Sequence, residues 1–366
     1  MDNSVIAARN IRRVRQLLKE RSLDALVVSL QHNFSWLTGG GDCHVGLATR
    51  DGAARLVITL DEAYLVANNI ETPRLLAEEI DSTLFKSRVF NWYEGDFSDL
   101  VEELVAGRTI GSDTSVPGTV LLESELGILR SVLGPEERER LNTAGRLVGE
   151  ALGQVCKELV PGDTEYELAG QLAGALFARE LTPTVLLVAG DERVSRFRHP
   201  IPTNKEVEKY AMVACVARYK GVQAAATRLI HFGPLDDELK RKHQAIVQVD
   251  ATLIGDSVPG RRLKDVLSSG IKIYEKMGFG EQWKLHHQGG IIGYWTRELI
   301  AKPNTDLKIE VNQAMAWNPS IAGTKSEDTI LVTNDGPQIV TTTSQWPLIE
   351  VHTENGTFLR PDILIR

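Results

Sequence analysis

The chain has 366 residues, which is long for one ordinary domain and suits two. Hydrophobic residues make up 42% of the sequence and charged residues 25%, a composition typical of soluble globular proteins. The net charge of −8 disfavours nucleic acids and anionic membranes as partners, because both repel an acidic protein. No apolar run approaches the roughly 20 residues that cross a bilayer. Three cysteines without paired spacing, and a first segment without a signal-peptide core, predict a cytoplasmic protein with reduced thiols.

The first part of the chain alternates between helical and strand patterns. Apolar residues recur at helical spacing between residues 6 and 22, and a short buried strand is expected over 23–30. Helix and strand patterns continue through residues 45–68, where Arg50-Asp51-Gly52 predicts a hairpin turn. Another strand is expected to end near Asp113. These patterns predict an α/β domain of about 130 residues.

The boundary to a second domain is expected at Gly134-Pro135, where one element ends. The acidic residues after Pro135 favour a new helix, because proline suits the first helical position and negative charge suits the start of a helix. We therefore place one domain at residues 1–133 and a second at residues 134–366. The second domain is expected to open with this helix, a turn at 160–164 and another helix to about Leu181.

One later segment, residues 310–333, places charge inside a strand-like pattern. Apolar residues flank a polar turn that contains Pro319 and Gly323, which predicts a strand, a turn and a second strand. Asn318 and the pair Glu327-Asp328 lie within this otherwise apolar frame. A charge in such surroundings is costly unless it is paired or used, so we expect a functional site here.

These segments resemble the creatinase, prolidase and methionine aminopeptidase family. The resemblance rests on the first helix and strand, on the turn at 160–164 with its following helix, and on Glu327–Thr333, and it covers nearly the whole chain. It implies an α+β fold class: an N-terminal creatinase-like α/β domain followed by a pita-bread domain, an antiparallel sheet flanked by helices. It also implies a homodimer. The loop Asp42-Cys43-His44 is then either lent to a neighbouring subunit's site or an ordinary surface loop, and we favour the surface loop.

In that family, five side chains hold a pair of metal ions. The surrounding residues place those five positions here on Ala214, Ala225, His287, Asn318 and Glu327. An alanine methyl group cannot bind a divalent ion, and a mononuclear zinc site normally has at least three strong protein ligands. We therefore expect a divergent member that lacks most metal ligands, with no catalytic metal and no cofactor.

The resemblance also suggests which residues would carry proton transfer. His199 precedes a proline-containing turn, as does a histidine that contacts substrate in the family, and it is our candidate acid–base residue. A loop histidine bonded to the backbone is the alternative. His287 is the second candidate, or His286 if the frame shifts by one residue. Tyr294 stands nearest to the position of the family's second catalytic histidine.

Other polar residues are expected to bind substrate. Arg228 would bind a substrate carboxylate, and Asn318 and Tyr219 would orient the substrate. Glu327, with Glu298, would hold a cationic group through parallel hydrogen bonds. A structural ion pair between Glu327 and Arg228 is the alternative, with equal weight.

Three functions remain open at this stage. The first is a creatinase-like, metal-independent hydrolase of a C–N bond in a small guanidino, amidino or amide substrate. The second is an Xaa-Pro aminopeptidase or dipeptidase that uses metal. The third is a non-catalytic protein that binds a ligand in the same pocket. The expected partners are a small-molecule substrate and a second copy of the chain, without nucleic acid or membrane.

Overall fold

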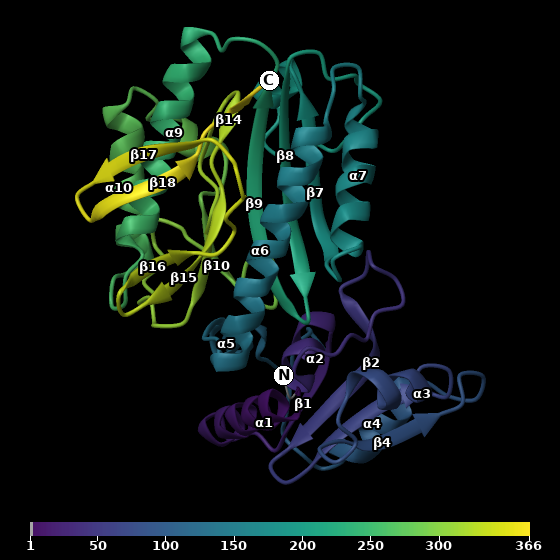
Figure 1. The fold of residues 1–366 in the computed structure, drawn as a ribbon. Coiled ribbons are helices and arrows are strands. Elements are labelled where there is room, and N and C mark those ends of the chain that lie inside the picture. Colours follow the sequence, from purple (N-terminus) through teal and green to yellow (C-terminus); the bar gives the residue numbers. More distant parts are fainter. Residues whose placement is uncertain (1–2) are drawn as a thin grey trace. The chain divides into compact units, whose positions relative to one another are not determined.

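The computed structural model describes residues 3–366, which form two compact units. The first unit ends at Glu137 and includes Lys220–Val222, and the second comprises Arg138–Tyr219 and Gln223–Arg366. Both units combine helices with sheets (Figure 1).

A six-stranded sheet forms the centre of the first unit, with strand order β4-β3-β2-β1-β5-β6. The central strand β1 pairs antiparallel with β2 and parallel with β5. The strands are β1 (Ala25–Leu30), β2 (Asp51–Thr59), β3 (Ala63–Asn68), β4 (Lys86–Phe90), β5 (Ile110–Ser112) and β6 (Val120–Leu121). The helices are α1 (Asn3–Glu20), α2 (Gln31–Thr38), α3 (Thr72–Arg74), the π-helix η1 (Leu75–Glu79), α4 (Phe97–Val105) and α5 (Glu123–Ser131).

The helix expected near the start of the chain is confirmed as α1. Its apolar residues Ile6, Ile11, Val14 and Leu18 recur at helical spacing and are at most 4% exposed, so one face of the helix is buried. The strand that follows is confirmed as β1, in which Ala25, Leu26, Val28 and Leu30 are buried, in keeping with a central place in the sheet.

The hairpin turn expected at Arg50-Asp51-Gly52 is wrong. Asp51 opens β2 and pairs with Leu30, and the turn of the hairpin lies between β2 and β3 instead. A Cβ atom on Gly52 would lie 2.4 Å from Sγ of Cys43, which is itself buried. The glycine therefore permits close packing inside a strand, which is a second common reason for glycine in a strand pattern.

The second unit contains two larger sheets and a set of helices. Helix α6 (Pro135–Glu158) starts at the end of the first unit and continues into the second. The other helices are α7 (Glu165–Phe177), α8 (Glu192–Arg196), α9 (Asp237–Asp256), α10 (Leu263–Lys276) and the 3₁₀-helix η2 (Gln282–Leu285). The strands are β7 (Thr182–Gly190), β8 (Tyr210–Tyr219), β9 (Val222–His231), β10 (Gly289–Ile292), β11 (Leu299–Ile300), β12 (Ala314–Trp317), β13 (Ser320–Ile321), β14 (Thr324–Lys325), β15 (Asp328–Thr333), β16 (Gly336–Ile339), β17 (Leu348–Thr353), β18 (Gly356–Pro361) and β19 (Leu364–Ile365).

Local signals in the sequence explain where several of these elements begin. Thr164 and Glu167 form a capping box, in which each side chain accepts a hydrogen bond from the other residue's backbone amide, and α7 starts there. Asp236 caps α9 through the amide of Leu239.

Strand order brings distant segments of the second unit together. One sheet has the order β11-β10-β12-β15-β16 and the other β19-β9-β8-β7. The long strands β7, β8 and β9 run side by side in Figure 1. The segment 310–333 forms β12, the short pair β13–β14 and β15, so the predicted strand, turn and strand are confirmed. Trp317 pairs with Asp328 in that register, which places Asn318 and Glu327 at the same end of the two strands.

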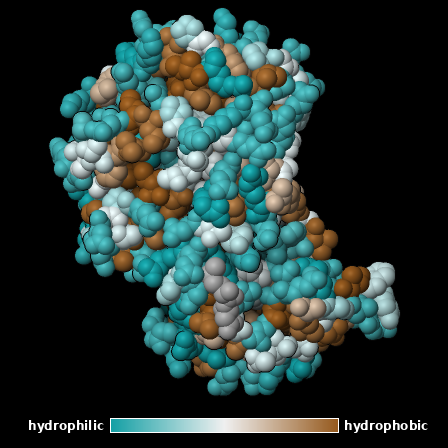
Figure 2. All heavy atoms as spheres, viewed as in Figure 1, coloured by the Kyte–Doolittle hydropathy of each residue, from teal (hydrophilic) through white to brown (hydrophobic). Residues whose placement is uncertain are grey.

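The part of the chain that the structure describes has no helix both long and apolar enough to cross a membrane. On the face shown in Figure 2, hydrophilic residues cover most of the surface, and hydrophobic residues gather in small groups among them. Exposed Leu348 and Leu359 lie on the β17–β18 hairpin. The expected homodimer stays a prediction.

Candidate active site

The second unit contains a cavity of about 230 Å³ at the ends of several strands. Strands β7 and β8 supply an apolar wall, and the loops around β10, β12 and β14 supply the polar groups. The lining residues are Val185, Leu187, His199, Ala214, Cys215, Val216, His287, Thr296, Arg297, Asn318, Lys325 and Glu327.

Glu327 lies between two side-chain cations in this cavity. Its Oε2 atom is 2.7 Å from Nζ of Lys325 and accepts a hydrogen bond of 2.6 Å from the Thr227 hydroxyl. Its Oε1 atom accepts a hydrogen bond of 3.2 Å from the Arg297 guanidinium. Glu327, Lys325 and the Arg297 side chain are at most 11% exposed. Both carboxylate oxygens are therefore already engaged by donors from the protein itself.

The two cations keep Glu327 ionised in spite of its burial. Burial alone would raise the pKa of this carboxyl group, but Lys325 and Arg297 outweigh burial and lower the pKa to about 2. The carboxylate is thus charged throughout the neutral range, and the two neighbouring cations exceed its charge by one.

Three histidines meet at one side of the cavity. Nε2 of His286 lies 3.1 Å from Nε2 of His199, and Nδ1 of His286 lies 2.9 Å from the Ser320 hydroxyl. The ring centroid of His287 is 4.8 Å from that of His286 and 5.7 Å from that of His199. His286 is buried, whereas His199 is exposed. Between two neutral imidazoles joined through their Nε2 atoms, one ring donates and the other accepts, so the tautomers of His199 and His286 are coupled.

All three imidazoles are held in the neutral form. Although part of the His199 side chain is exposed, partial burial of its ring, followed by the charge of Lys325, lowers its pKa; burial and the same Lys325 charge lower the pKa of His286. Burial and the nearby Arg297 lower the pKa of His287 to about 4. Neutral imidazoles can accept a proton near pH 7, which is the state that a general base needs.

Several buried polar atoms at the cavity lack a hydrogen-bond partner among residues 3–366. They are Nδ1 of His287, Oδ1 of Asn318 and Nε of Arg297. Since buried polar groups are normally paired, each of these atoms is suited to contact a ligand or an ordered water.

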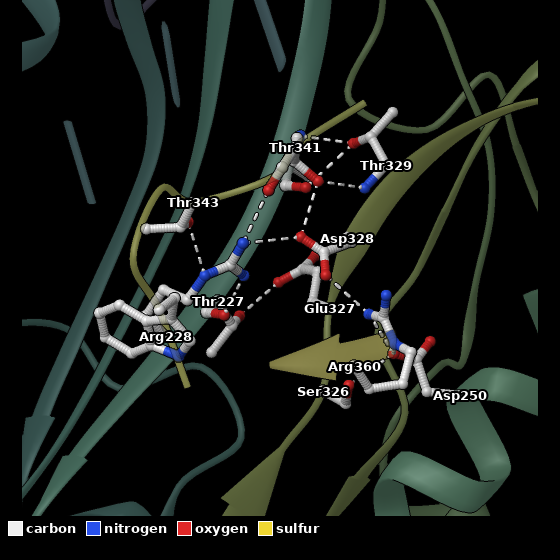
Figure 3. A network of polar contacts seen from close by, with 12 residues as sticks. Thr227, Arg228, Asp250, Ser326, Glu327, Asp328, Thr329, Thr341, Thr343 and Arg360 are labelled. Atoms are coloured by element: carbon white, nitrogen blue, oxygen red, sulfur yellow. Dashed lines mark hydrogen bonds and ion pairs between the residues drawn. The ribbon is translucent and has the colours of Figure 1, made fainter. Parts of the chain in front are cut away.

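Behind Glu327, the next residue belongs to a closed ionic network (Figure 3). Asp328 accepts a hydrogen bond of 3.1 Å from Arg228 and one of 2.7 Å from Arg360. Arg360 also binds Asp250, at 2.6 Å, and the Ser326 hydroxyl donates to the same Asp250 oxygen. Along 325–328, Lys325 and Glu327 thus face the cavity while Ser326 and Asp328 face the network, the alternation of an extended backbone.

This arrangement corrects the role expected for Arg228. The side chain is 1% exposed, and its guanidinium donates to Thr343, Asp328 and the backbone oxygens of Thr227 and Thr341. It is therefore a structural residue without access to a substrate carboxylate. The alternative pairing of Arg228 with Glu327 is also wrong, since Arg228 pairs with Asp328.

The other predicted site residues separate into two groups. His199, His287, Asn318 and Glu327 line the cavity, and His286 contacts it through His199. Tyr219, Tyr294 and Glu298 do not line it. Tyr294 is fully buried, and the Glu298 carboxylate accepts the backbone amide of Trp295. The role of Glu327 as holder of a cationic substrate is not supported, because Lys325 and Arg297 already occupy its oxygens.

The residues around Glu327 do not fit a pair of metal ions. Ala214 and Ala225 offer no ligand atom, and a divalent ion at Glu327 would meet the ammonium group of Lys325 and the guanidinium of Arg297. The nitrogen atoms of His199, His286 and His287 that could bind a metal lie within 4.8 Å of one another, so this group could hold one ion.

Lys325 and Arg297 were not recognised from the sequence as partners of Glu327. Lys325 lies in a polar turn pattern, and Arg297 stands beside Glu298 as in a surface ion pair. The sequence does contain one indication of this pairing. Lys325 and Glu327 are two residues apart, and in an extended segment such residues point to the same face.

Known protein families match both units of the chain. Residues 139–334 match the metallopeptidase family M24, and residues 10–127 match the creatinase/prolidase N-terminal domain. An uncharacterized peptidase of Staphylococcus epidermidis is 20% identical over 354 residues, covering 90% of this chain and 98% of that protein. The chain belongs to the M24 metallopeptidase family, a family of hydrolases.

Solved structures show the same architecture. The prolidase from Pyrococcus horikoshii OT3 superposes with a TM-score of 0.80 at 18% identity, covering 92% of this chain and 99% of that one. The Xaa-Pro dipeptidase from Bacillus anthracis gives 0.78 at 18% identity, covering 98% and 100%. The N-terminal domain of the FACT complex subunit SPT16 from chickpea gives 0.73 at 12% identity, covering 94% and 97%. The expected fold class, a creatinase-like N-terminal domain followed by a pita-bread domain, is confirmed.

Proposed function

We propose that this chain hydrolyses a C–N bond of the amide type in a small substrate without a catalytic metal pair. One observation carries the proposal: the carboxylate that faces the cavity is paired with Lys325 and Arg297, beside neutral imidazoles. Fixed cations next to a neutral base supply the two requirements of hydrolysis, charge stabilisation and proton transfer.

The reaction would divide between these groups as follows. A water molecule attacks the carbonyl carbon and gives its proton to Nδ1 of His199, which is free to accept when Nε2 of His199 carries its own proton and donates to Nε2 of His286, 3.1 Å away. The negative charge that develops on the carbonyl oxygen is stabilised by Lys325 and Arg297. The C–N bond then breaks, and His199 returns the proton to the leaving nitrogen, which yields a carboxylic acid and an amine. His287, with an unpartnered Nδ1 atom, is the second group suited to move this proton.

A metal-dependent Xaa-Pro peptidase is the second candidate. It is supported by the family to which the chain belongs and by the group His199, His286 and His287, whose ligand atoms lie within 4.8 Å of one another. This activity would require at least one ion at that group, because Glu327 is occupied by side-chain cations.

The test is a hydrolysis assay on protein freed of metal by a chelator, with bound metal measured in the same sample. Xaa-Pro dipeptides and N-acyl amino acids serve as substrates, with and without added Mn²⁺ or Co²⁺. The proposal expects hydrolysis that chelation leaves unchanged. Activity that appears only with metal would establish the second candidate, and ligand binding without hydrolysis of any tested compound would favour a non-catalytic binding protein.

The matched variants are His199→Ala and His352→Ala. His199 lines the cavity, whereas the His352 side chain is 75% exposed on β17. Loss of a general acid–base group should lower kcat by about 100-fold or more, with little change in substrate binding. The control should keep the activity of the unmodified protein. Equal kcat values for both variants would refute the role of His199.

A further inference from the structure

We infer that the cavity is a receptor for a small organic carboxylate, bound by Lys325 and Arg297 with its apolar part against β7 and β8. The inference rests on the proposed function only for the location of the site, because binding requires no turnover. The charge of this carboxylate is opposite to that of the guanidino and amidino compounds considered from the sequence. In the proposed hydrolysis it corresponds to the acid product, whose carboxylate takes the place of the amide carbonyl beside the two cations.

The first argument is the charge of the cavity. Two side-chain cations, Lys325 and Arg297, stand against one carboxylate, Glu327, which leaves one net positive charge among the lining residues. Protonation of any of the histidines would only add to it. A cationic substrate would be repelled by this net positive charge, and the one lining carboxylate, Glu327, is already paired. An anion would neutralise the charge.

The second argument is the number of unused hydrogen-bond donors. The Lys325 ammonium has three N–H groups, and Glu327 is its partner among residues 3–366. The Arg297 guanidinium has five, of which one reaches Glu327 and one the backbone oxygen of Thr296. Its Nε atom is buried without a partner. An anion with two acceptor oxygens uses such donors, and charge-assisted bonds of this kind are the stronger ones.

The third argument is the apolar part of the cavity lining. Val185, Leu187 and Val216 line the cavity together with Ala214 and Cys215. These side chains offer nothing to a highly charged group such as inorganic phosphate, but they suit a short aliphatic chain. A volume of about 230 Å³ limits the occupant to a small molecule. A carboxylate head with a small apolar body therefore matches both the charged and the apolar lining residues.

The ionic network behind the cavity explains why the cations stay available. Asp328 and Asp250 are held by Arg228 and Arg360, which are both buried (Figure 3). These two carboxylates therefore cannot turn to neutralise Lys325. Among residues 3–366, Glu327 is the one carboxylate that lines the cavity with Lys325, and one carboxylate does not balance two cations.

The experiment measures binding of three probes with one carbon skeleton by isothermal titration calorimetry. The probes are 3-methylbutanoate, the neutral 3-methylbutanamide and the cationic 3-methylbutylammonium, with inorganic phosphate as a fourth ligand. We expect the carboxylate to bind at least ten-fold more tightly than the amide, and the ammonium compound not to bind. Equal affinity for acid and amide, or preference for the cation, would overturn the inference. Tighter binding of phosphate would overturn the assignment to a carboxylate.

Three variants locate the binding site. Lys325→Met and Arg297→Gln each remove one cation and should weaken 3-methylbutanoate at least ten-fold. Glu327→Gln removes the negative charge beside Lys325 and Arg297, so it should keep or strengthen the binding of 3-methylbutanoate. If the site instead bound a cation, the same change would weaken binding. The control is Lys302→Met, an exposed lysine that does not line the cavity. Should Lys325→Met fail to fold, Arg297→Gln and the probe series on the unmodified protein still decide the matter.

The outcome is separable from that of the hydrolysis assay. Carboxylate binding without hydrolysis of any amide refutes the proposed function and keeps the receptor. Hydrolysis of neutral amides, with no preference for a carboxylate and no effect of Lys325→Met on binding, refutes the receptor and keeps the hydrolase.

Discussion

The adjacent carboxylates Glu327 and Asp328 bind the same kinds of side chain, but one lies at the cavity and the other in the buried network. Glu327 contacts two cations and a threonine hydroxyl at the cavity, and Asp328 contacts two cations and a threonine hydroxyl in the closed network. The cations around Asp328 are at most 1% exposed and packed against protein, whereas Lys325 and Arg297 line the cavity. Composition alone therefore does not separate a structural ion cluster from a binding site; the difference lies in which cations border the cavity.

The largest effect on stability is expected from Asp328→Asn. This change leaves Arg228 and Arg360 buried with a single carboxylate, Asp250, as counterion, and breaking a buried ionic group typically costs about 3–5 kcal/mol. Urea unfolding of the variant and the parent protein measures the loss. We expect a smaller loss of stability for Glu327→Gln, since water can enter the cavity and solvate the cations there. A larger loss for Glu327→Gln would mean that the cavity does not give these cations more access to water than the buried network does.

The stability that Glu327 contributes is expected to decrease at acidic pH. The pKa of Glu327 is lowered to about 2, so the stability that its charge contributes is fully present above the ordinary pKa of 4.5 and is lost as the pH falls toward 2. The difference in unfolding free energy between the parent and Glu327→Gln should therefore be constant from pH 7 to about 5 and shrink below it. Glu354→Gln, an exposed change on the β17–β18 hairpin, is the control. A difference that grows on acidification would contradict the assigned direction.

The smallest effects should come from the two threonines that donate to these carboxylates. Thr227→Val removes one hydrogen bond to Glu327, which can be replaced by water in the cavity, and should cost about 1 kcal/mol. Thr341→Val removes the bond to Asp328 and also strands the buried amide of Thr329, so about 1–3 kcal/mol is expected. Equilibrium unfolding of both variants under one set of conditions gives the order. A larger loss of stability for Thr227→Val than for Thr341→Val would mean that water reaches Asp328 more easily than Glu327.

Much of the fold followed from local patterns, and the failures have a physical cause. The capping box at Thr164 and the period of α1 are local signals, and they predicted their helices. Gly52 was misinterpreted because sequence does not reveal that Cys43 packs against it from an earlier loop. A contact between distant segments decides the role of such a glycine.

The site shows the same limit. His199, His287, Asn318 and Glu327 could be found because family spacing marks them, and all four line the cavity. The partner of Arg228 could not be found, since Glu327 and Asp328 are adjacent and face opposite sides, and only strand register decides which one it meets. The surplus of cations, which reverses the expected charge of the ligand, depends on Arg297 from a separate loop.

The cations beside Glu327 are side chains of the protein and not dissociable ions. Lys325 and Arg297 are joined to the chain by covalent bonds, so each molecule carries one of each. A dissociable ion would be present in a fraction of molecules that varies with its free concentration. The occupancy of these two positions is instead set by the amino-acid sequence, so every copy of the protein carries the same two cations beside this carboxylate.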